Sequence, residues 1–277
     1  MAIYITKPWY KKGYSEPDTW EPIDWGTYKP SSGEDVWSDG DNIYYSKSNK
    51  SSENFIFDSA NESWSLKTWS FLMSSFHGTY VWTDLDGDVY VSVNRSIMHL
   101  NKSTGNWENI SCTFPDSSYT LYGTSVFTDG YDVYSSSKGG YPTRLIKTSP
   151  TVIEWRSASW SGRSSFNGVD TWTDGKKLYM TDNNINTPGS FEQASRGTRT
   201  WNTKTWNIST GASFIWTDGV KTYLSWDSNH YVLNTTTGEW ERKTWNGLTN
   251  FRGQYVWTDG NNIYYSKDDD QYKLVKR

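Results

Sequence analysis

The chain has 277 residues and a formal net charge of −4, from 27 basic and 31 acidic side chains. Charges of both signs are dispersed along it, so the sequence offers no electrostatic footprint for nucleic acid or for an anionic membrane. The single cysteine, Cys112, excludes an intramolecular disulfide, and no run of about 18 apolar residues is available to insert into a membrane.

The first 18 residues form the first predicted element. Their opening, MAIYITKPWYKK, lacks the continuous apolar core of a signal peptide, so we expect a protein made without a secretion signal. The segment matches none of the repeats that follow, and we predict an N-terminal arm over residues 1–18. It is too apolar for a free tail, so it either packs back on the domain or docks into a larger assembly by strand addition. The docking residues would be Ile3, Tyr4, Ile5, Trp9 and Tyr10.

A repeated phrase runs through residues 19–277. The sequence GEDVWSDGDNIYYSK at 33–47 returns almost unchanged as GQYVWTDGNNIYYSK at 253–267. A period near 45 residues indicates one closed array of repeats rather than two independent domains. The anchor aromatic of the phrase recurs after 45, 45, 45, 44 and 41 residues, as Trp37, Trp82, Phe127, Trp172, Trp216 and Trp257.

A second phrase, Trp-x4-Trp, lies between the anchors. Because five is an odd separation, the two side chains of a pair point to opposite faces of a straight strand. We therefore predict that each such strand gives one indole to each neighbouring repeat. We interpret Cys112, which takes one Trp position, as a small buried hydrophobe rather than a reactive thiol. The pairs are Trp64/Trp69, Trp107/Cys112, Trp155/Trp160, Trp201/Trp206 and Trp240/Trp245, and a sixth, Trp20/Trp25, precedes the first anchor.

Each repeat contains four short strands separated by turns. In residues 211–245 they are ASFIWT, TYLS, HYVL and WERKTW, with Asp218-Gly219 as the first hairpin turn. Four antiparallel strands per period are the unit of a β-propeller blade. The chain ends in a third strand, QYKLVKR, whose missing partner is the early TWEPIDW at 19–25. We therefore predict an all-β, six-bladed β-propeller over residues 19–277, closed by an N-terminal outer strand that completes the last blade.

These repeats resemble kelch-type propellers, and more narrowly the kelch-like arrays of Trp- and Asn-rich repeats encoded by tailed bacteriophages. The resemblance is carried by TWNGLTNFRGQYVWTDGNNIYYSKDDDQYKL at 244–274 and its degenerate copies. The second strand ends in Ser or Thr, as at Ser46 and Ser266, where kelch repeats usually show a Gly-Gly pair. The resemblance implies a virion protein of the tail, collar or capsid, assembled in the host cytoplasm, whose partners are other virion proteins and a host-surface glycan or receptor.

Other functions stay open beside this one. The ring could be a rigid structural or interaction protein within a virion assembly. Tectonin-type lectin propellers share a Trp followed by a turn and a Val/Ile-Tyr strand, so a soluble lectin is a further alternative, as is a polysaccharide-active enzyme. We expect a non-enzymatic protein without catalytic residues.

The loops divide into a uniform set and a variable set. The turns between first and second strands are nearly identical, whereas the blade-to-blade connections and the loops between second and third strands diverge, which favours binding on the variable face. Tyr and Trp beside Asn and Ser suit sugar rings, although such residues can equally pack the loops between blades. The candidate ligand-binding residues are Phe71, Phe76, Tyr119, Tyr122, Tyr141, Arg163, Phe166, Trp226, Phe251 and Arg252.

The chemistry expected of a metal or cofactor site is weak. The three histidines fall in different blades, and we predict no cofactor and no metal site. The acidic runs Asp84–Asp88 and Asp268–Asp270 could hold Ca²⁺, but we interpret both as solvated turns. The aspartate repeated in the first turn of each blade is expected to accept hydrogen bonds from the amides of its own turn. These aspartates are at positions 39, 84, 129, 174, 218 and 259.

Overall fold

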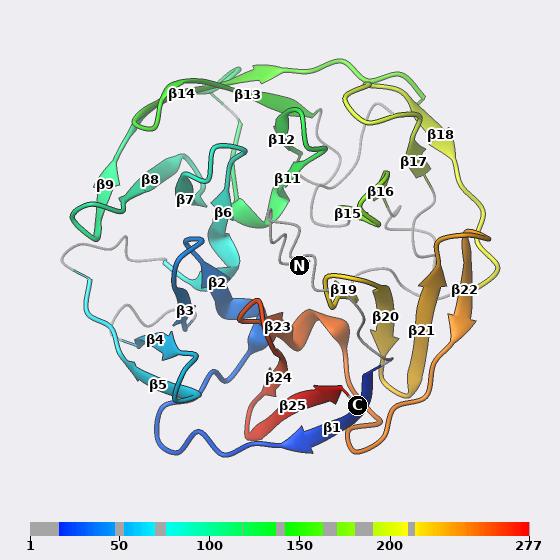
Figure 1. Ribbon diagram of the computed structural model, residues 1–277. Coiled ribbons are helices and arrows are strands. Elements are labelled where there is room, and N and C mark those ends of the chain that lie inside the picture. The colour runs from blue at the N-terminus through cyan, green and yellow to red at the C-terminus, as the bar shows by residue number, and fades with distance from the viewer. Residues whose placement is uncertain are drawn as a thin grey trace.

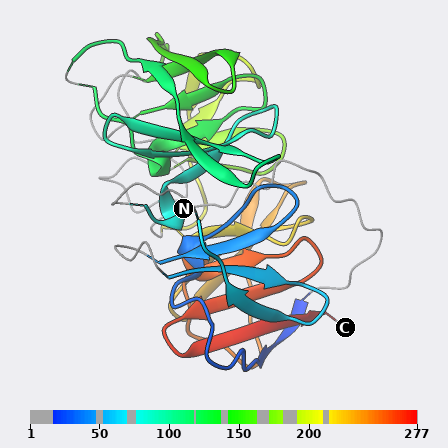
Figure 2. The same cartoon turned by 90° about the vertical axis from the view of Figure 1, so that its left-hand side faces the viewer.

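A ring of six blades makes up the protein (Figure 1). The structure is a computed structural model, and it describes residues 17–47, 53–69, 76–117, 119–136, 142–162, 171–180, 191–209 and 214–276. Each blade has four antiparallel strands that run from the centre of the ring outwards, as predicted; in five blades they are consecutive in the sequence, and in the sixth the outermost strand comes from the N-terminal part of the chain. Seen from the side, the blades stand next to one another around the ring (Figure 2).

The first three blades take up the first part of the ring. Blade 1 consists of β2 (Val36–Ser38), β3 (Ile43–Ser46), β4 (Asn54–Asp58) and β5 (Ser63–Leu66). Blade 2 consists of β6 (Val81–Thr83), β7 (Val89–Val93), β8 (Ser96–Asn101) and β9 (Asn106–Asn109). Blade 3 consists of β11 (Val126–Thr128), β12 (Val133–Ser135), β13 (Thr143–Ser149) and β14 (Val152–Ser157), and β10 (Ser111–Thr113) adds to its outer edge in parallel.

The last three blades complete the ring. Blade 4 consists of β15 (Thr171–Thr173), β16 (Leu178–Met180), β17 (Phe191–Gln193) and β18 (Trp201–Thr203). Blade 5 consists of β19 (Ile215–Thr217), β20 (Thr222–Trp226), β21 (Asn229–Asn234) and β22 (Glu239–Arg242). Blade 6 consists of β23 (Val256–Thr258), β24 (Ile263–Lys267), β25 (Asp270–Lys276) and β1 (Pro17–Pro22).

The two ends of the described chain close the ring in blade 6. β1 pairs antiparallel with β25, with Trp20 opposite Leu274 and Pro17 opposite Lys276. We predicted this strand within residues 19–25, and it is formed two residues earlier, by Pro17–Pro22. The order of strands in this sheet, β1-β25-β24-β23, confirms that an N-terminal outer strand completes the last blade.

The paired tryptophans fill the seams between blades. At the seam of blades 6 and 1, Trp25 packs against Trp64 and the anchor Trp257, with ring centroids 6.1 and 5.4 Å apart. The two members of every pair lie in different clusters, so each pair serves both neighbouring seams, as predicted. The second member is not in the outer strand itself, however: Trp69 and Trp245 follow the ends of β5 and β22. The remaining seams join Trp69 with Trp107, Cys112 with Trp155, Trp160 with Trp201, Trp206 with Trp240, and Trp245 with Trp20.

The serine at the end of the second strand has a structural role that the sequence did not reveal. The indole nitrogen of Trp37 donates a hydrogen bond of 3.0 Å to the hydroxyl of Ser46, and Trp216 makes the same bond with Ser225. Both groups are buried, so the serine satisfies a donor that would otherwise lose its hydrogen bond to water. The same bond joins Trp82 with Ser92 and Trp257 with Ser266.

The uniform turns between first and second strands are held by their aspartates, as predicted. In blade 1 the Oδ1 of Asp39 accepts hydrogen bonds from the backbone amides of Asp41 and Asn42, and its Oδ2 accepts one from the hydroxyl of Tyr44. The backbone amides of the tight turn are thus hydrogen-bonded by a side chain of the turn itself. Asp174, Asp218 and Asp259 make the equivalent bonds in blades 4, 5 and 6.

Among the residues that the structure describes, the first strand of four blades is preceded by a single turn of 3₁₀ helix near the centre of the ring. These turns are η1 (Gly33–Asp35), η2 (Gly78–Tyr80), η3 (Gly123–Ser125) and η5 (Gly253–Tyr255). Each begins with glycine because the backbone of the preceding blade passes very close: a Cβ on Gly78 would lie 1.8 Å from the carbonyl oxygen of Asp35. None of the described helices has the length and apolarity needed to cross a membrane.

Candidate functional site

The two faces of the ring differ in the way their connections are built. One, the turn face, carries the first-to-second and third-to-fourth strand turns. The other, the loop face, carries the blade-to-blade connections and the second-to-third strand loops, because successive hairpins of an antiparallel blade point to alternate ends. The turn face is held by the repeated aspartates, whereas the loop face is where the blades differ. A binding site is therefore expected on the loop face.

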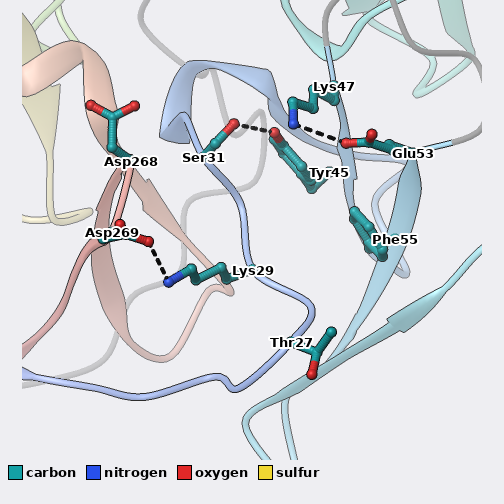
Figure 3. A pocket seen from close by; sticks show the side chains of 9 residues that line it. All are labelled: Thr27, Lys29, Ser31, Tyr45, Lys47, Glu53, Phe55, Asp268 and Asp269. Atoms are coloured by element: carbon teal, nitrogen blue, oxygen red, sulfur yellow. Dashed lines mark hydrogen bonds and ion pairs between the residues drawn. The ribbon is translucent and has the colours of Figure 1, made fainter.

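A cleft of about 300 Å³ opens on the loop face at the seam where the ring closes (Figure 3). It is bounded by the connection from β1 to η1, by the ends of β3 and β4 in blade 1, and by the turn between β24 and β25 in blade 6. Three segments that are distant in the sequence thus meet at one place. The lining residues are Thr27, Lys29, Ser31, Tyr45, Lys47, Glu53, Phe55, Asp268 and Asp269.

Backbone hydrogen bonds fix the connection that forms one wall of the cleft. The amide of Asp268 donates to the carbonyl oxygen of Ser31 at 2.8 Å, and the side-chain amide of Gln271 donates to the carbonyl oxygen of Pro30 at 3.0 Å. Asp268 itself has a φ of 53°, the left-handed conformation that a tight β-hairpin turn requires. The walls from blade 6 and from residues 27–31 therefore form one rigid unit.

The polar side chains of the cleft are arranged in pairs (Figure 3). Lys29 lies 2.7 Å from a carboxylate oxygen of Asp269, and Lys47 lies 2.9 Å from one of Glu53. The hydroxyl groups of Ser31 and Tyr45 share a hydrogen bond of 2.7 Å. The hydrogen bond and charge of Lys29 hold the pKa of Asp269 below its usual range. Every lysine of the lining thus has a carboxylate partner.

Aromatic rings form the apolar part of the cleft. Phe55, at its base, stacks on Tyr45 with ring centroids 5.8 Å apart and planes 7° apart. Tyr28 lies between two lining residues, Thr27 and Lys29, and is not itself part of the lining; its ring contacts Phe55 at a centroid distance of 5.3 Å, and 43% of its surface is exposed. Tyr28 is an exposed ring that is held in place from below. It lies in the variable connection GTYKPSS, so its position was a signal that our sequence analysis overlooked.

A second cluster on the loop face unites two of the predicted residues, Trp226 and Arg252. Both contact Phe214: its ring centroid lies 6.3 Å from that of Trp226 and 5.3 Å from the guanidinium carbon of Arg252. Arg252 also forms an ion pair of 3.0 Å with Asp227. The two predicted residues are half-buried, and the structure does bring them together at the seam of blades 5 and 6.

Two of the predicted binding residues are buried, so this part of the prediction was wrong. Phe76 is 1% exposed and packs 5.3 Å from Trp107, and Phe251 is 2% exposed and packs 5.3 Å from Trp20. The connection from one blade to the next crosses the seam between them, so an aromatic residue there covers the tryptophan cluster below. The alternative interpretation, loop packing, holds for both.

Two further predicted residues lie on the loop face near the seam of blades 2 and 3. The hydroxyl of Tyr119 is 2.7 Å from that of Thr143, and its ring packs on the tryptophan cluster of this seam. Tyr122 is half-buried, donates a hydrogen bond to the side chain of Asn94, and lies 5.8 Å from the ring of Tyr80. Outside the described residues lie Phe71, Tyr141, Arg163 and Phe166, together with the arm residues Ile3, Tyr4, Ile5, Trp9 and Tyr10.

The 3₁₀ turns surround the centre of the ring on the loop face. Adjacent turns η5, η1, η2 and η3 contact one another in that order. The side-chain amide of Gln254 donates to the carboxylate of Glu34 across blades 6 and 1, at 3.3 Å. Burial raises the pKa of Glu34 above its usual range. The residues of this central ring are therefore engaged with their neighbours in adjacent blades.

One cluster of carboxylates has the geometry of a cation site, and a lysine fills it. Asp84, Asp86 and Asp88 of the expanded turn in blade 2 bring one oxygen each within 4.8 Å of one another. The ammonium group of Lys147, from β13 of blade 3, lies 2.6, 2.5 and 2.7 Å from these oxygens. Asp84 is buried, so the expectation of a solvated turn was wrong. The cluster is an ionic bridge between two blades.

Several solved proteins have folds similar to this chain. A putative gluconolactonase aligns with 95% of this chain and 94% of its own at 11% identity, with a TM-score of 0.54. YCF48 bound to D1 peptide aligns with 95% of this chain and 97% of its own at 8% identity and a TM-score of 0.53. The extracellular domain of a putative one-component system from B. thetaiotaomicron aligns with 95% of this chain at 12% identity and a TM-score of 0.53. The alignment covers 39% of that domain, so this chain spans about two fifths of its length.

At these identities the likeness shows the fold alone, that of a six-bladed β-propeller. No protein-family model matches the sequence, and no curated protein is similar to it at a significant level. The functional interpretation therefore depends on the residues of this chain.

Proposed function

We propose that the protein is a non-enzymatic recognition propeller of a tailed-phage virion, which binds a host-surface glycan or receptor through its loop face and attaches to other virion proteins through its N-terminal residues. The fold is consistent with an interaction or structural role. The virion setting rests on the resemblance of the Trp- and Asn-rich repeats to phage-encoded arrays.

The observation that carries the proposal is the difference between the two faces. The turn face repeats one aspartate-held hairpin, whereas the loop face has a cleft at one seam and the cluster of Trp226, Phe214 and Arg252 at the next. Unequal loops on a repetitive scaffold are typical of binding surfaces. A rigid ring also holds such loops in place, which lowers the entropy cost of binding.

The pairing of the cleft carboxylates supports binding rather than hydrolysis. Asp269 is paired with Lys29 and Glu53 with Lys47. A general acid must hold its proton near neutral pH, which requires a raised pKa, and the pKa of Asp269 is instead lowered. Hydrolysis of a surface polysaccharide by the purified protein, lost on Asp268→Asn, would overturn the non-enzymatic part of the proposal.

The test is binding of the purified full chain, and of a truncated chain that starts at Pro17, to host cells. Binding by both is expected if recognition belongs to the loop face. The full chain alone should then associate with co-encoded virion proteins. Binding by the full chain only would move recognition to the first 16 residues, and binding by neither would contradict a receptor-binding role.

A second candidate is a rigid structural ring within an assembly, favoured by the six aromatic seams and the closure by both chain ends. Such a protein would bind only co-encoded proteins. Loss of that binding on changes to the loop face, with no binding to cells, would identify this role.

A further inference from the structure

We propose that the cleft between blades 6 and 1 is a subsite for one or two sugar rings of a neutral saccharide, with Tyr28 as the stacking platform at its edge. The inference rests on the proposed function, since it names the ligand class for the same face. Four observations carry it: the size of the cleft, its charge balance, its paired hydrogen-bonding groups and its exposed ring.

The size of the cleft limits its occupant. Its volume of about 300 Å³ is at the lower end of small-molecule sites, which measure about 300–1,000 Å³. A compact ligand of one or two rings suits this space, whereas a folded peptide element does not. The cleft is also open to the loop face, so further units of a longer chain can extend into solvent.

The charge balance argues for a neutral ligand. Two ammonium groups, of Lys29 and Lys47, face three carboxylates, of Glu53, Asp268 and Asp269. Both lysines already have a carboxylate within 2.9 Å. Sites for sulfate, phosphate or carboxylate groups present cations or backbone amides in excess. This lining has no such excess, and it therefore disfavours acidic sugars and other anions.

The paired polar groups suit vicinal hydroxyls. A sugar hydroxyl both donates and accepts hydrogen bonds. Nζ of Lys47 and Oε2 of Glu53 are 2.9 Å apart, so one hydroxyl can accept a hydrogen bond from Lys47 while it donates one to Glu53. The hydroxyl pair of Ser31 and Tyr45 offers the same combination of donor and acceptor. Charge-assisted hydrogen bonds of this kind are stronger than neutral ones.

The exposed ring of Tyr28 supplies the apolar contact. Its surface is 43% exposed while its inner side rests on Phe55. Sugar rings carry an apolar face of C–H groups, which stacks on aromatic rings. Because Tyr28 packs on Phe55, which in turn stacks on the buried Tyr45, the platform loses little freedom when a ligand binds.

Because the cleft joins blades 6 and 1, a bound sugar should also change the thermal stability of the ring. A bound sugar would touch the connection after β1, the ends of β3 and β4, and the turn before β25, which belong to both sides of the closing seam. A ligand that binds only the folded ring raises its stability by mass action. Binding should therefore raise the midpoint of thermal unfolding in a saturable manner.

The experiment compares the intact protein with three variants on an array of neutral and acidic glycans, followed by titration of each hit. Tyr28→Ala removes the platform and should weaken binding at least about tenfold. Tyr28→Phe keeps the ring and should bind within about threefold of the intact protein. The double variant Lys47→Met/Glu53→Gln removes one polar pair without a net change in charge and should also weaken binding about tenfold.

Tyr131→Ala is the matched control, because Tyr131 is an exposed tyrosine in the turn between β11 and β12, on the turn face, and its loss should leave glycan binding unchanged. Binding restricted to acidic glycans, or binding weakened as much in Tyr131→Ala as in Tyr28→Ala, would overturn the inference while the proposed function stands. Absence of any glycan binding by the intact protein also overturns it, whereas cell binding then decides separately whether the loop face recognises a host protein. A thermal shift that is equal in Tyr28→Ala and the intact protein would likewise contradict the site.

Discussion

Trp25 and Trp64 lie on opposite sides of the closing seam with their ring centroids 6.1 Å apart, although one follows β1 and the other lies in β5 of the next blade. Trp257 contacts both, at 5.4 Å from each. The seam beside the blade in which β1 and β25 pair therefore has the same kind of aromatic packing as the others. Closure depends on it as much as on the hydrogen bonds between β1 and β25.

Removal of β1 should open the ring. A truncated chain that starts at Ile23 lacks the partner of β25 and the side chain of Trp20, which is 1% exposed. Loss of a buried Trp alone costs about 3–5 kcal/mol. We expect loss of cooperative unfolding or aggregation through the exposed edge of β25, measured by thermal melting and gel filtration. A chain that starts at Pro17 is the control and should melt like the full chain.

Because the anchor tryptophan donates a hydrogen bond to the second-strand serine, loss of this serine should lower the free energy of unfolding more in a blade with a Trp anchor than in blade 3. Ser225→Ala leaves the buried indole N–H of Trp216 without its acceptor and should lower the free energy of unfolding by about 1–3 kcal/mol. Blade 3 offers a matched control because its anchor is Phe127. There Ser135 is bonded to Ser125, whose hydroxyl also bonds to the carbonyl of Tyr122. Ser135→Ala should therefore cost less, and equal costs in urea titrations would contradict this explanation.

The glycine that begins each 3₁₀ turn should not tolerate alanine. In Gly78→Ala the new Cβ would lie 1.8 Å from the carbonyl oxygen of Asp35, so two blades must move apart. We expect a loss of about 3 kcal/mol or more. Gly26→Ala is the control: its φ of 65° is unfavourable for alanine, but no atom lies within 4 Å of the new Cβ. Its cost should stay near ~1 kcal/mol, measured in the same denaturant.

Lys147 should contribute strongly to stability, because its removal leaves three carboxylates together. We expect Lys147→Met to lower the free energy of unfolding by about 3 kcal/mol. Lys147→Arg keeps the charge and should cost less, and Lys176→Met, on an exposed turn, should cost almost nothing. Added Ca²⁺ should restore part of the stability of Lys147→Met only. Equal melting of all three variants would contradict the ionic bridge.

The same bridge predicts a dependence on pH. Burial opposes ionisation of Asp88, but the hydrogen bond and charge of Lys147 outweigh it and hold the pKa of Asp88 below its usual 3.8. Its contribution is therefore present above pH 3.8 and is lost as the pH falls through the lower folded pKa. Burial opposes the charge of Lys147, but the hydrogen bonds that it donates to the three carboxylates outweigh burial and raise its pKa above the usual 10.5, so its contribution is complete below that pH. In Lys147→Met the loss of stability towards acid pH should be smaller than in the intact protein.

Cys112 should react slowly with thiol reagents. Burial raises its pKa to about 12, so almost no thiolate exists at pH 8. A chromogenic disulfide reagent should label the folded protein slowly at pH 8 and faster as the pH rises, and it should label the unfolded protein at once. Rapid labelling of the folded chain at pH 8 would show that the thiol is accessible and ionised.

The fold was largely predictable because the sequence motif of one blade occurs six times in the chain. The spacing of the anchors defined the blades. The members of each Trp pair do lie in two different seams, but the odd separation in a straight strand is not the reason, since Trp69, for example, follows the end of β5. Ser46 was visible in the sequence as a repeated residue, but its role was not, because its bond to Trp37 depends on a contact between adjacent strands. Phe76 and Phe251 were misjudged because a residue in a variable loop can still cover a seam.

The cleft could not be predicted from the sequence. Lys29, Glu53 and Asp269 come from three segments that meet only after the ring has closed. None of them belongs to a repeated phrase, and their ion pairs depend on the shape of two connections. The sequence offered two separate signals of this place, Tyr28 in a variable connection and the acidic run Asp268–Asp270, but nothing in it showed that they lie together.

Because Pro17 and Lys276 are opposite one another in the pairing of β1 with β25, the ring responds to mechanical load according to where it is held. Tension between its two termini loads the hydrogen bonds of this pair one after another, as a zipper is pulled, and such geometry yields at low force. A pull between the N-terminal end of β1 and a ligand in the cleft passes through blades 6 and 1 and leaves the other four blades unloaded. Attachment by one end is thus the arrangement in which the ring best withstands tension.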